Sequence, residues 1–236
     1  MSDAPIPPND NPKSASLIAP EPTPVEADAF SRRLRGMMDG QTKDEATVTK
    51  ASEGLEEIFE LIAAGLYSLA SMLVGEGEES MRLVEAAIAN AEVSVCHDPQ
   101  EARQSSRRVL SAAALDLLAE RDPAILAAPE GLEPATSCID DDDLASAGIS
   151  TEELESLISG PDRDRVRKWL ASLPTTLRTV FVLRAVAGFT AVETAALLQK
   201  HGGTQAAGWT PEATREVFRQ GLCSLASQLL HATVAR

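Results

Sequence analysis

The chain of 236 residues carries a formal net charge of −15, from 36 acidic and 21 basic side chains. Its apolar fraction of 44% is sufficient for one or two small cores, whereas an aromatic fraction of 3% argues against a platform that stacks nucleic-acid bases. No apolar run is as long as the roughly 18 residues that a membrane span requires, and no secretory signal is visible. We therefore expect no membrane span and a cytoplasmic protein.

The cysteines and histidines give no indication of a metal centre or an active site. Cys96, Cys138 and Cys223 are widely spaced and odd in number, so we expect no disulfide framework and a reducing compartment. Cys96 is followed by His97, but no second pair of ligands stands at zinc spacing. No nucleophile–base motif or phosphate-binding loop appears either. We predict no cofactor and no enzymatic activity.

The N-terminal half of the chain is predicted to hold a tail and a helical bundle. Residues 1–50 are expected to be a disordered tail, because half of the 14 prolines lie between Pro5 and Pro24; the alternative for residues 31–40, SRRLRGMMDG, is a short helix. Apolar residues then recur at steps of three and four, which predicts three helices. They cover residues 52–74, 78–93 and 100–121. In the third, we expect an inward face made of Val109, Leu110, Ala113, Leu117 and Leu118. Together these helices predict a small antiparallel bundle over residues 51–122.

Residues 123–160 are predicted to be a flexible acidic linker. Prolines and glycines interrupt its first part, and Asp140–Asp143 is a run of four acids. The alternating spacing and the glycine of a calcium-binding loop are missing, so a solvated linker is the better interpretation. A short helix is expected over residues 151–158, with Ser150 or Thr151 as its N-cap.

The C-terminal domain, residues 161–236, has the pattern of a helix-turn-helix. Helices are predicted over residues 163–173, 175–187, 191–200 and 211–233. Thr190 and Glu193 form a capping box at the start of the third, and Thr210 followed by Pro211 marks the start of the fourth. No strand pattern is present. The predicted fold is therefore all-α, with two small helical domains joined by the linker, and the last pair of helices can place a helix in a DNA major groove.

Charge is distributed unevenly along the chain. Residues 162–236 contain ten Lys and Arg against five Asp and Glu, whereas residues 1–161 contain eleven against 31. A basic end on an acidic protein is typical of a module that contacts phosphates. The alternative is that Arg163, Arg165, Arg167 and Lys168 form the solvated face of one helix, and charge alone does not choose between the two.

The candidate DNA contacts lie mainly on the last helix. Arg215 and Arg219 stand four residues apart, where they can meet phosphates or base edges. Thr210 and Thr214 can add hydrogen bonds to phosphate. The alternative is an ordinary exposed helix whose glutamates pair with these arginines.

Further candidate DNA contacts stand on and before the preceding helix. Thr190 belongs to this group, with Lys200 and Arg184 as lesser candidates. For Arg184, the competing expectation is a structural ion pair with Glu193. The two tryptophans are expected to pack in the core.

The C-terminal residues resemble the RNA polymerase sigma factors of the extracytoplasmic-function type, over about seventy residues. The matching positions include Leu173-Pro174, Arg178, the run Val180–Leu183, Arg184, Gly188, Phe189-Thr190, Glu193, Ala195, Leu197-Leu198, Arg215, Phe218 and Leu225. In that family this domain, region 4, binds the −35 promoter element and the β flap of the polymerase. The resemblance implies the helix-turn-helix fold and promoter DNA as a partner.

A weaker resemblance covers the N-terminal bundle. The segment LYSLASMLVGEGEESMRLVEAAI, from Leu66 to Ile88, is similar to the start of region 2, and Ala114–Leu118 is similar to a later region 2 helix. Region 2 binds core RNA polymerase and the melted −10 element, so the resemblance implies polymerase contacts at Arg82 and Glu85. The family usually carries an acid and a glutamine at these two positions.

Three functional hypotheses follow. The first is a sigma-like initiation protein that binds promoter DNA and recruits core RNA polymerase. The second is a degenerate sigma mimic that binds the polymerase or an anti-sigma factor without melting DNA. It is motivated by the replaced region 2 residues and by a net charge of about −9 over residues 51–128. The third is a stand-alone helix-turn-helix regulator that binds duplex DNA as a dimer.

Overall fold

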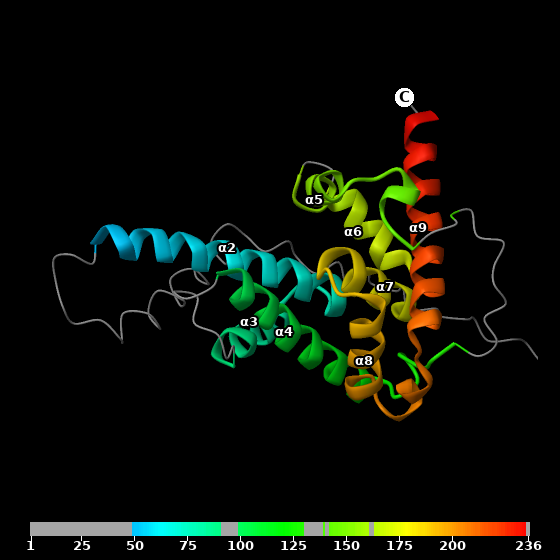
Figure 1. Cartoon of the computed structure of the whole chain (residues 1–236), viewed down its shortest axis with the longest axis horizontal. Helices are drawn as coiled ribbons and strands as arrows, with labels where there is room; N and C mark the ends of the chain where they lie inside the picture. The colour runs from blue at the N-terminus through cyan, green and yellow to red at the C-terminus, as the bar shows by residue number, and fades with distance from the viewer. Residues whose placement is uncertain (1–48, 91–98, 130–138, 140–141, 161–162, 235–236) are drawn as a thin grey trace, which may run out of the picture. The chain divides into compact units, whose positions relative to one another are not determined.

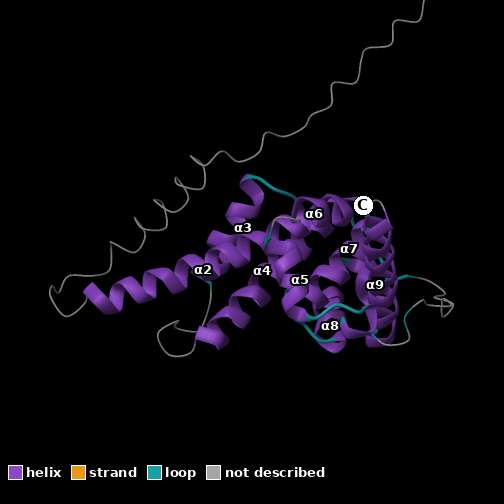
Figure 2. Cartoon of the chain, turned by 90° about the horizontal axis from the view of Figure 1, so that it is seen from above, coloured by secondary structure: helices purple, strands orange, loops and turns teal. Residues whose placement is uncertain are grey.

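Helices account for all the regular secondary structure that the structure, a computed structural model, describes (Figure 1). The described residues are 49–90, 99–129, 139, 142–160 and 163–234, and no strand is present among them (Figure 2). The chain divides into two units, Met1–Glu45 and Ala46–Arg236, and all described residues belong to the second. The predicted tail lies outside the described residues, except for Thr49 and Lys50, which begin the first helix.

The order of elements agrees with the predicted helices to within a few residues. The helices are α2 (Thr49–Val74), α3 (Glu78–Ala89), α4 (Pro99–Arg121), α5 (Thr151–Ser159), α6 (Arg163–Ser172), α7 (Thr175–Phe181), α8 (Ala191–His201) and α9 (Pro211–Val234). Two short 3₁₀ turns, η1 (Ala145–Ala147) and η3 (Thr204–Gly208), stand before α5 and α9. A π-helical turn, η2 (Val182–Val186), continues α7. The prediction of an all-α fold is confirmed for the described residues.

Helices α2, α3 and α4 pack against one another and bury an aliphatic core. Its largest fully buried members are Leu66, Leu69 and Leu73 from α2 and Leu110 and Leu115 from α4. Gly75 and Gly77 both have positive φ angles, 97° and 133°, which L side chains rarely adopt, so they permit the sharp turn from α2 into α3. The apolar residues that recur at helical spacing in the sequence are therefore the ones that pack the bundle together.

The inward face of α4 differs from the predicted one. Leu110 and Leu118 are buried as expected, but Val109, Ala113 and Leu117 are only half-buried. The buried positions follow the steps Ala102, Ser106, Leu110, Ala114 and Leu118. The helix is rotated from the expected orientation because α4 packs on α8 as well as on α2 and α3, so its apolar residues serve two contacts.

Helices α7, α8 and α9 form a second core that contains aromatic rings. The ring of Phe181 lies edge-on to Trp169, with centroids 5.1 Å apart, and 5.6 Å from the ring of Phe218. Gly221 of α9 lies against the same phenyl ring: a Cβ at this position would come within 2.8 Å of Phe181 Cδ2. The missing side chain thus allows α9 to approach α7 closely.

The segment expected to be a flexible linker is, in its described part, packed against the C-terminal helices. Leu126, Ile139 and Ile149 are buried. The backbone N–H of Ala128 donates to the carbonyl of Gln205, and the hydroxyl of Thr176 donates to the carbonyl of Ile125 at 2.7 Å. Buried apolar residues and hydrogen bonds therefore fix the described ends of this segment. The proline content and the charge of the segment did not indicate this packing. A capping box at Ser150 starts α5, in agreement with one of the two predicted N-caps.

The bundle and the C-terminal helices are in contact within this one unit. Helix α4 packs on α8, and the contact carries the ion pair Arg108–Glu193, with a separation of 2.6 Å between Nη2 and Oε1. His201 Nδ1 lies 3.1 Å from Asp116 at the other end of the same contact. The division into two domains stays a prediction, since the residues assigned to them form a single compact unit.

Two further expectations concern the membrane and the cysteines. Among the residues that the structure describes, none of the helices is both long enough and apolar enough to cross a bilayer. Cys223, which is half-buried on α9, is disulfide-bonded. Cys223 therefore departs from the expectation that the cysteines form no disulfide framework, while Cys96 and Cys138 lie outside the described residues.

Candidate nucleic-acid interface

The first element of the candidate interface is the start of α8. Thr190 Oγ1 accepts a hydrogen bond from Glu193 N at 3.2 Å, and the Glu193 carboxylate accepts one from Thr190 N at 3.0 Å. This is the predicted capping box, which satisfies two backbone donors at the helix N-terminus. The hydrogen bond from the Thr190 backbone, followed by the Thr190 hydroxyl and Arg108, lowers the pKa of Glu193.

The turn between α8 and α9 is built around Trp209. Its ring is fully buried, and its indole Nε1 donates to the carbonyl of Leu126 at 2.9 Å. The side-chain amide of Gln199 donates to the Trp209 carbonyl. Both tryptophans are therefore packing residues, as predicted. The segment between the two helices is a folded turn with its own anchor in the core.

The two threonines predicted to contact phosphate have different environments at the start of α9. Thr210 is exposed, and its hydroxyl accepts a hydrogen bond from Ala213 N at 3.1 Å, which makes it the N-cap of this helix. Thr214 is fully buried, and its hydroxyl donates to the Thr210 carbonyl at 3.0 Å. The prediction of a phosphate contact at Thr214 is therefore wrong, because its hydroxyl faces the protein interior and already has an acceptor.

Each arginine of α9 has an acidic partner. Arg215, whose side chain is 47% exposed, lies 3.4 Å from Glu212 and 3.8 Å from Asp142. Arg219 is less exposed and pairs with Glu216, a glutamate that is itself buried. These pairs with Glu212 and Glu216 are the ones that the alternative interpretation of the helix expected. Of the two arginines, Arg215 has the larger exposed surface for a contact with phosphate.

Arg184, in the π-helical turn, is held inside the C-terminal core. Its guanidinium donates to the Asp142 carboxylate at 2.7 Å and to the Phe189 carbonyl at 3.3 Å, and it lies 4.9 Å from the centre of the Phe218 ring. Burial lowers the pKa of Arg184, and the nearby Asp142 carboxylate opposes this change. The predicted partner Glu193 was wrong: Glu193 pairs with Arg108 instead.

The remaining residues that the sequence analysis proposed as contacts do not lie on α9. Lys200 is exposed in the last turn of α8. Arg82 and Glu85 lie one turn apart on α3: Arg82 is exposed and pairs with Glu78 at 2.8 Å, and Glu85 is half-buried. Thr210 and Arg215 thus both lie exposed in the first turns of α9, and the predicted polymerase contacts lie on the bundle.

Asp142 is the functional candidate that the sequence analysis missed. It contacts both Arg184 and Arg215, although more than forty positions separate it from each of them in the sequence. The signal was present in the acidic run Asp140–Asp143, but the run does not show which of its members meets an arginine. A group of three or more metal-ligating side chains is absent from the part of the chain that the structure describes.

No protein-family model matches the chain, and no match is found among curated proteins or solved structures. The functional argument therefore depends on the residues and their geometry.

Proposed function

We propose that the protein binds promoter DNA through α8 and α9 and recruits core RNA polymerase through its α2–α4 bundle, as a sigma-like initiation protein. The observation that supports this most is the pair α8–α9. Helix α8 is capped by Thr190 and packs against α9. At the start of α9, Thr210 and Arg215 are exposed. A helix N-terminus with an exposed hydroxyl and a guanidinium is suited to phosphate and to the guanine edge.

The ion pairs of Asp142 imply a condition on this binding. Arg215 must turn from Asp142 and Glu212 toward DNA before it can contact a phosphate. The bound state therefore exchanges one anion for another, and the net gain is smaller than for an unpaired arginine. We expect an affinity for DNA that falls steeply with salt and rises when the acidic segment is neutralised.

The decisive experiment is transcription in vitro with purified core RNA polymerase and a library of genomic promoters, with and without the protein. Specific transcripts that appear only with the protein would support the proposal. Arg215→Ala should reduce these transcripts, whereas Arg165→Ala, an exposed arginine on α6, should retain them. Equal activity of the two variants would contradict the role of α9.

A second candidate function, a sigma mimic that binds proteins without opening DNA, is favoured by the contact between α4 and α8. Arg108 and Asp116 of α4 pair with Glu193 and His201 of α8, so α8 covers one flank of the helix that resembles part of region 2. Co-purification with the polymerase or with an anti-sigma factor, in the absence of new transcripts, would favour this candidate.

A further inference from the structure

The disulfide bond of Cys223 is unexpected in a chain for which the sequence predicts a reducing compartment. Cys223 is half-buried on α9, and it is disulfide-bonded. Disulfides are rare in reducing compartments, where those present are usually transient and serve catalysis or redox sensing. The chain has no Cys-x-x-Cys motif of the kind that catalyses thiol exchange. Redox sensing is therefore the role to examine for this bond.

The partner of Cys223 can be inferred from the segments that pack on α9. The chain contains two other cysteines, Cys96 and Cys138. Helix α9 packs on α7, α8 and the turn η1, whereas α4, which begins three residues after Cys96, packs on α2, α3 and α8. Cys138 precedes Ile139, which is buried, and stands four positions before Asp142. The packing of the described neighbours therefore favours Cys138.

The reach of the backbone is sufficient for this pairing. Asp142 Oδ2 lies 3.8 Å from Arg215 Nε. Cys223 stands eight positions after Arg215 on α9, which corresponds to about 12 Å along the helix. Four residues of extended chain span up to about 14 Å. A cysteine four positions before Asp142 can therefore reach Cys223.

The segment next to this bond carries the acid that pairs with two arginines. Arg184 Nη2 donates to the Asp142 carboxylate at 2.7 Å, and Arg215 lies beside the same carboxylate. On the C-terminal side of Asp142, the segment is held by the packing of η1 on α9 and by the burial of Ile149. Partly exposed ion pairs contribute little by themselves. A covalent bond on the N-terminal side would restrict the segment from both sides.

We propose that the disulfide of Cys223 is a redox-controlled crosslink that keeps Asp142 on Arg184 and Arg215 when oxidised and releases it when reduced. Reduction by a dithiol breaks the S–S bond: the two sulfur atoms take up two electrons and two protons, and the dithiol becomes a disulfide. Exchange with an oxidised dithiol reverses the step. The effect on DNA rests on the proposed function, whereas the crosslink and the release of the segment do not.

Tryptic digestion without reduction tests the pairing. The three cysteines fall in separate tryptic fragments, residues 83–103, 122–163 and 220–236. After incubation of the full-length protein with oxidised dithiothreitol, mass spectrometry should find fragment 122–163 joined to fragment 220–236. Reduced dithiothreitol should separate the two. A bond between fragments 83–103 and 220–236, or no bond at all, would overturn the proposal, because the segment with Asp142 would then be untied.

Hydrogen exchange tests the release without any DNA. The amide groups of Gly148 and Ile149 donate to carbonyls within the segment. Reduction of the wild type should speed their exchange at least about threefold, because the segment loses one of its attachments. Cys223→Ser should exchange at the reduced rate with or without reductant, and Cys96→Ser should respond as the wild type does. Equal exchange of the oxidised and reduced wild type would overturn the proposal.

Binding of a duplex DNA of random sequence, measured by fluorescence anisotropy at low salt, tests the consequence for α9. Reduction of the wild type should raise its affinity roughly fivefold, since Asp142 no longer competes with phosphate for Arg215. In Asp142→Asn, reduction should change the affinity less than about twofold, because the competing charge is already absent. Equal rises in the two proteins would overturn the proposal. Release of the segment without DNA binding in either redox state would instead contradict the proposed function and leave the crosslink standing.

Discussion

The bundle α2–α4 and the helices α6–α9 use different cores. Among the residues whose burial is described, the bundle core is aliphatic, whereas the C-terminal core contains Trp169, Phe181, Phe189, Trp209 and Phe218. Truncation of a buried Phe or Trp to Ala costs about 3–5 kcal/mol, against about 2–5 kcal/mol for a buried Leu or Ile. The C-terminal helices are therefore the part of the molecule in which single substitutions should have the largest effects.

The same two regions differ in how their arginines are used. The arginines of α9 pair with Asp142, Glu212 and Glu216, whereas Arg108 of α4 pairs across the contact between the regions with Glu193 of α8. A count of charges along the sequence separates an acidic part from a basic part, but it does not show which arginine meets which acid. The following predictions test these differences, beginning with the largest expected effect.

Removing Trp209 should break the C-terminal core. Its ring is fully buried and its Nε1 holds the carbonyl of Leu126, so Trp209→Ala loses both packing and a hydrogen bond. We expect the free energy of unfolding to fall by about 3–5 kcal/mol, measured by chemical denaturation. Val192→Ala, at a residue 59% exposed on α8, should change it by less than about 0.5 kcal/mol. Similar losses in the two variants would contradict the role of the ring.

A Gly→Ala substitution should change the stability of the protein in opposite directions in the two regions. Gly221→Ala places a methyl group within 2.8 Å of the Phe181 ring, which is fixed by Trp169 and Phe218, and should destabilise the protein by about 1–3 kcal/mol. Gly65→Ala in α2 meets no atom within 4 Å and should stabilise it by up to about 1 kcal/mol. Thermal unfolding of both variants measures this difference, and stabilisation by Gly221→Ala would show that α9 can move away from α7.

Neutralising Asp142 should raise the affinity of the protein for DNA. Asp142→Asn weakens the pairs with Arg184 and Arg215, so affinity for promoter DNA should rise roughly fivefold at low salt. Glu120→Gln makes the same change in net charge on the exposed face of α4 and serves as the control. Fluorescence anisotropy with duplex DNA gives both affinities. A rise of equal size in the control would assign the effect to net charge alone.

The contact between the two regions should depend on pH through Glu193. The hydrogen bond from Thr190 N lowers the pKa of this carboxylate in the folded state, so its contribution to stability is present above about pH 4.5 and is lost as the pH falls through the folded pKa. Relative to Glu193→Gln, the wild type should be more stable by at most about 1 kcal/mol at pH 7. Urea unfolding between pH 7 and pH 3 should show this advantage disappearing, and a constant difference would contradict the argument.

Local patterns in the sequence predicted the helices and their ends. Capping by Ser150, Thr190 and Thr210 depends on residues within three positions of each helix start, so it is visible without the fold. Hydrophobic periodicity likewise predicted α2, α3 and α9. The exposed members of the candidate interface, Thr210 and Arg215, followed from the same reasoning.

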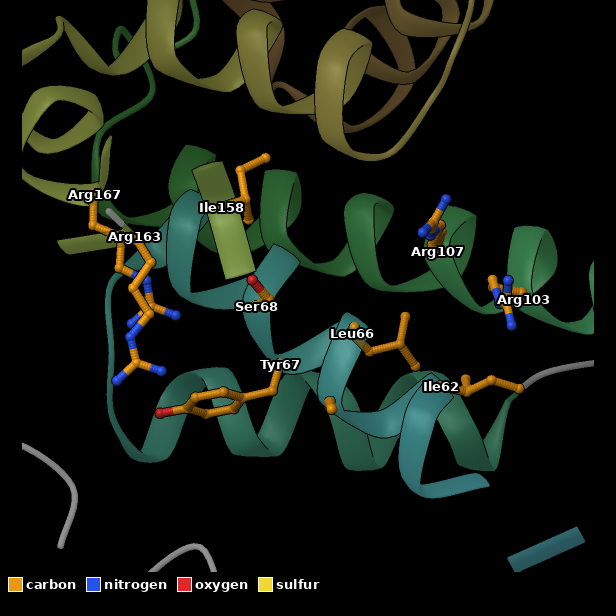
Figure 3. Close-up of a pocket in the computed structure, with 11 residues that line it drawn as sticks. Ile62, Leu66, Tyr67, Ser68, Arg103, Arg107, Ile158, Arg163 and Arg167 are labelled. Atoms are coloured by element: carbon orange, nitrogen blue, oxygen red, sulfur yellow. The ribbon is translucent and has the colours of Figure 1, made fainter. Parts of the chain in front are cut away.

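Contacts between distant segments were decided by the tertiary structure alone. The burial of Thr214, the pairs of Asp142 with Arg184 and Arg215, and the cavity that arginines of α4 and α6 line together with residues of α2 (Figure 3) depend on how helices pack. The sequence by itself determined an all-α chain with an acidic and a basic part, because helix formation and charge are local properties. Which charges neutralise one another, and which surround a cavity, was decided only by the packing of segments that lie between about 40 and 100 positions apart.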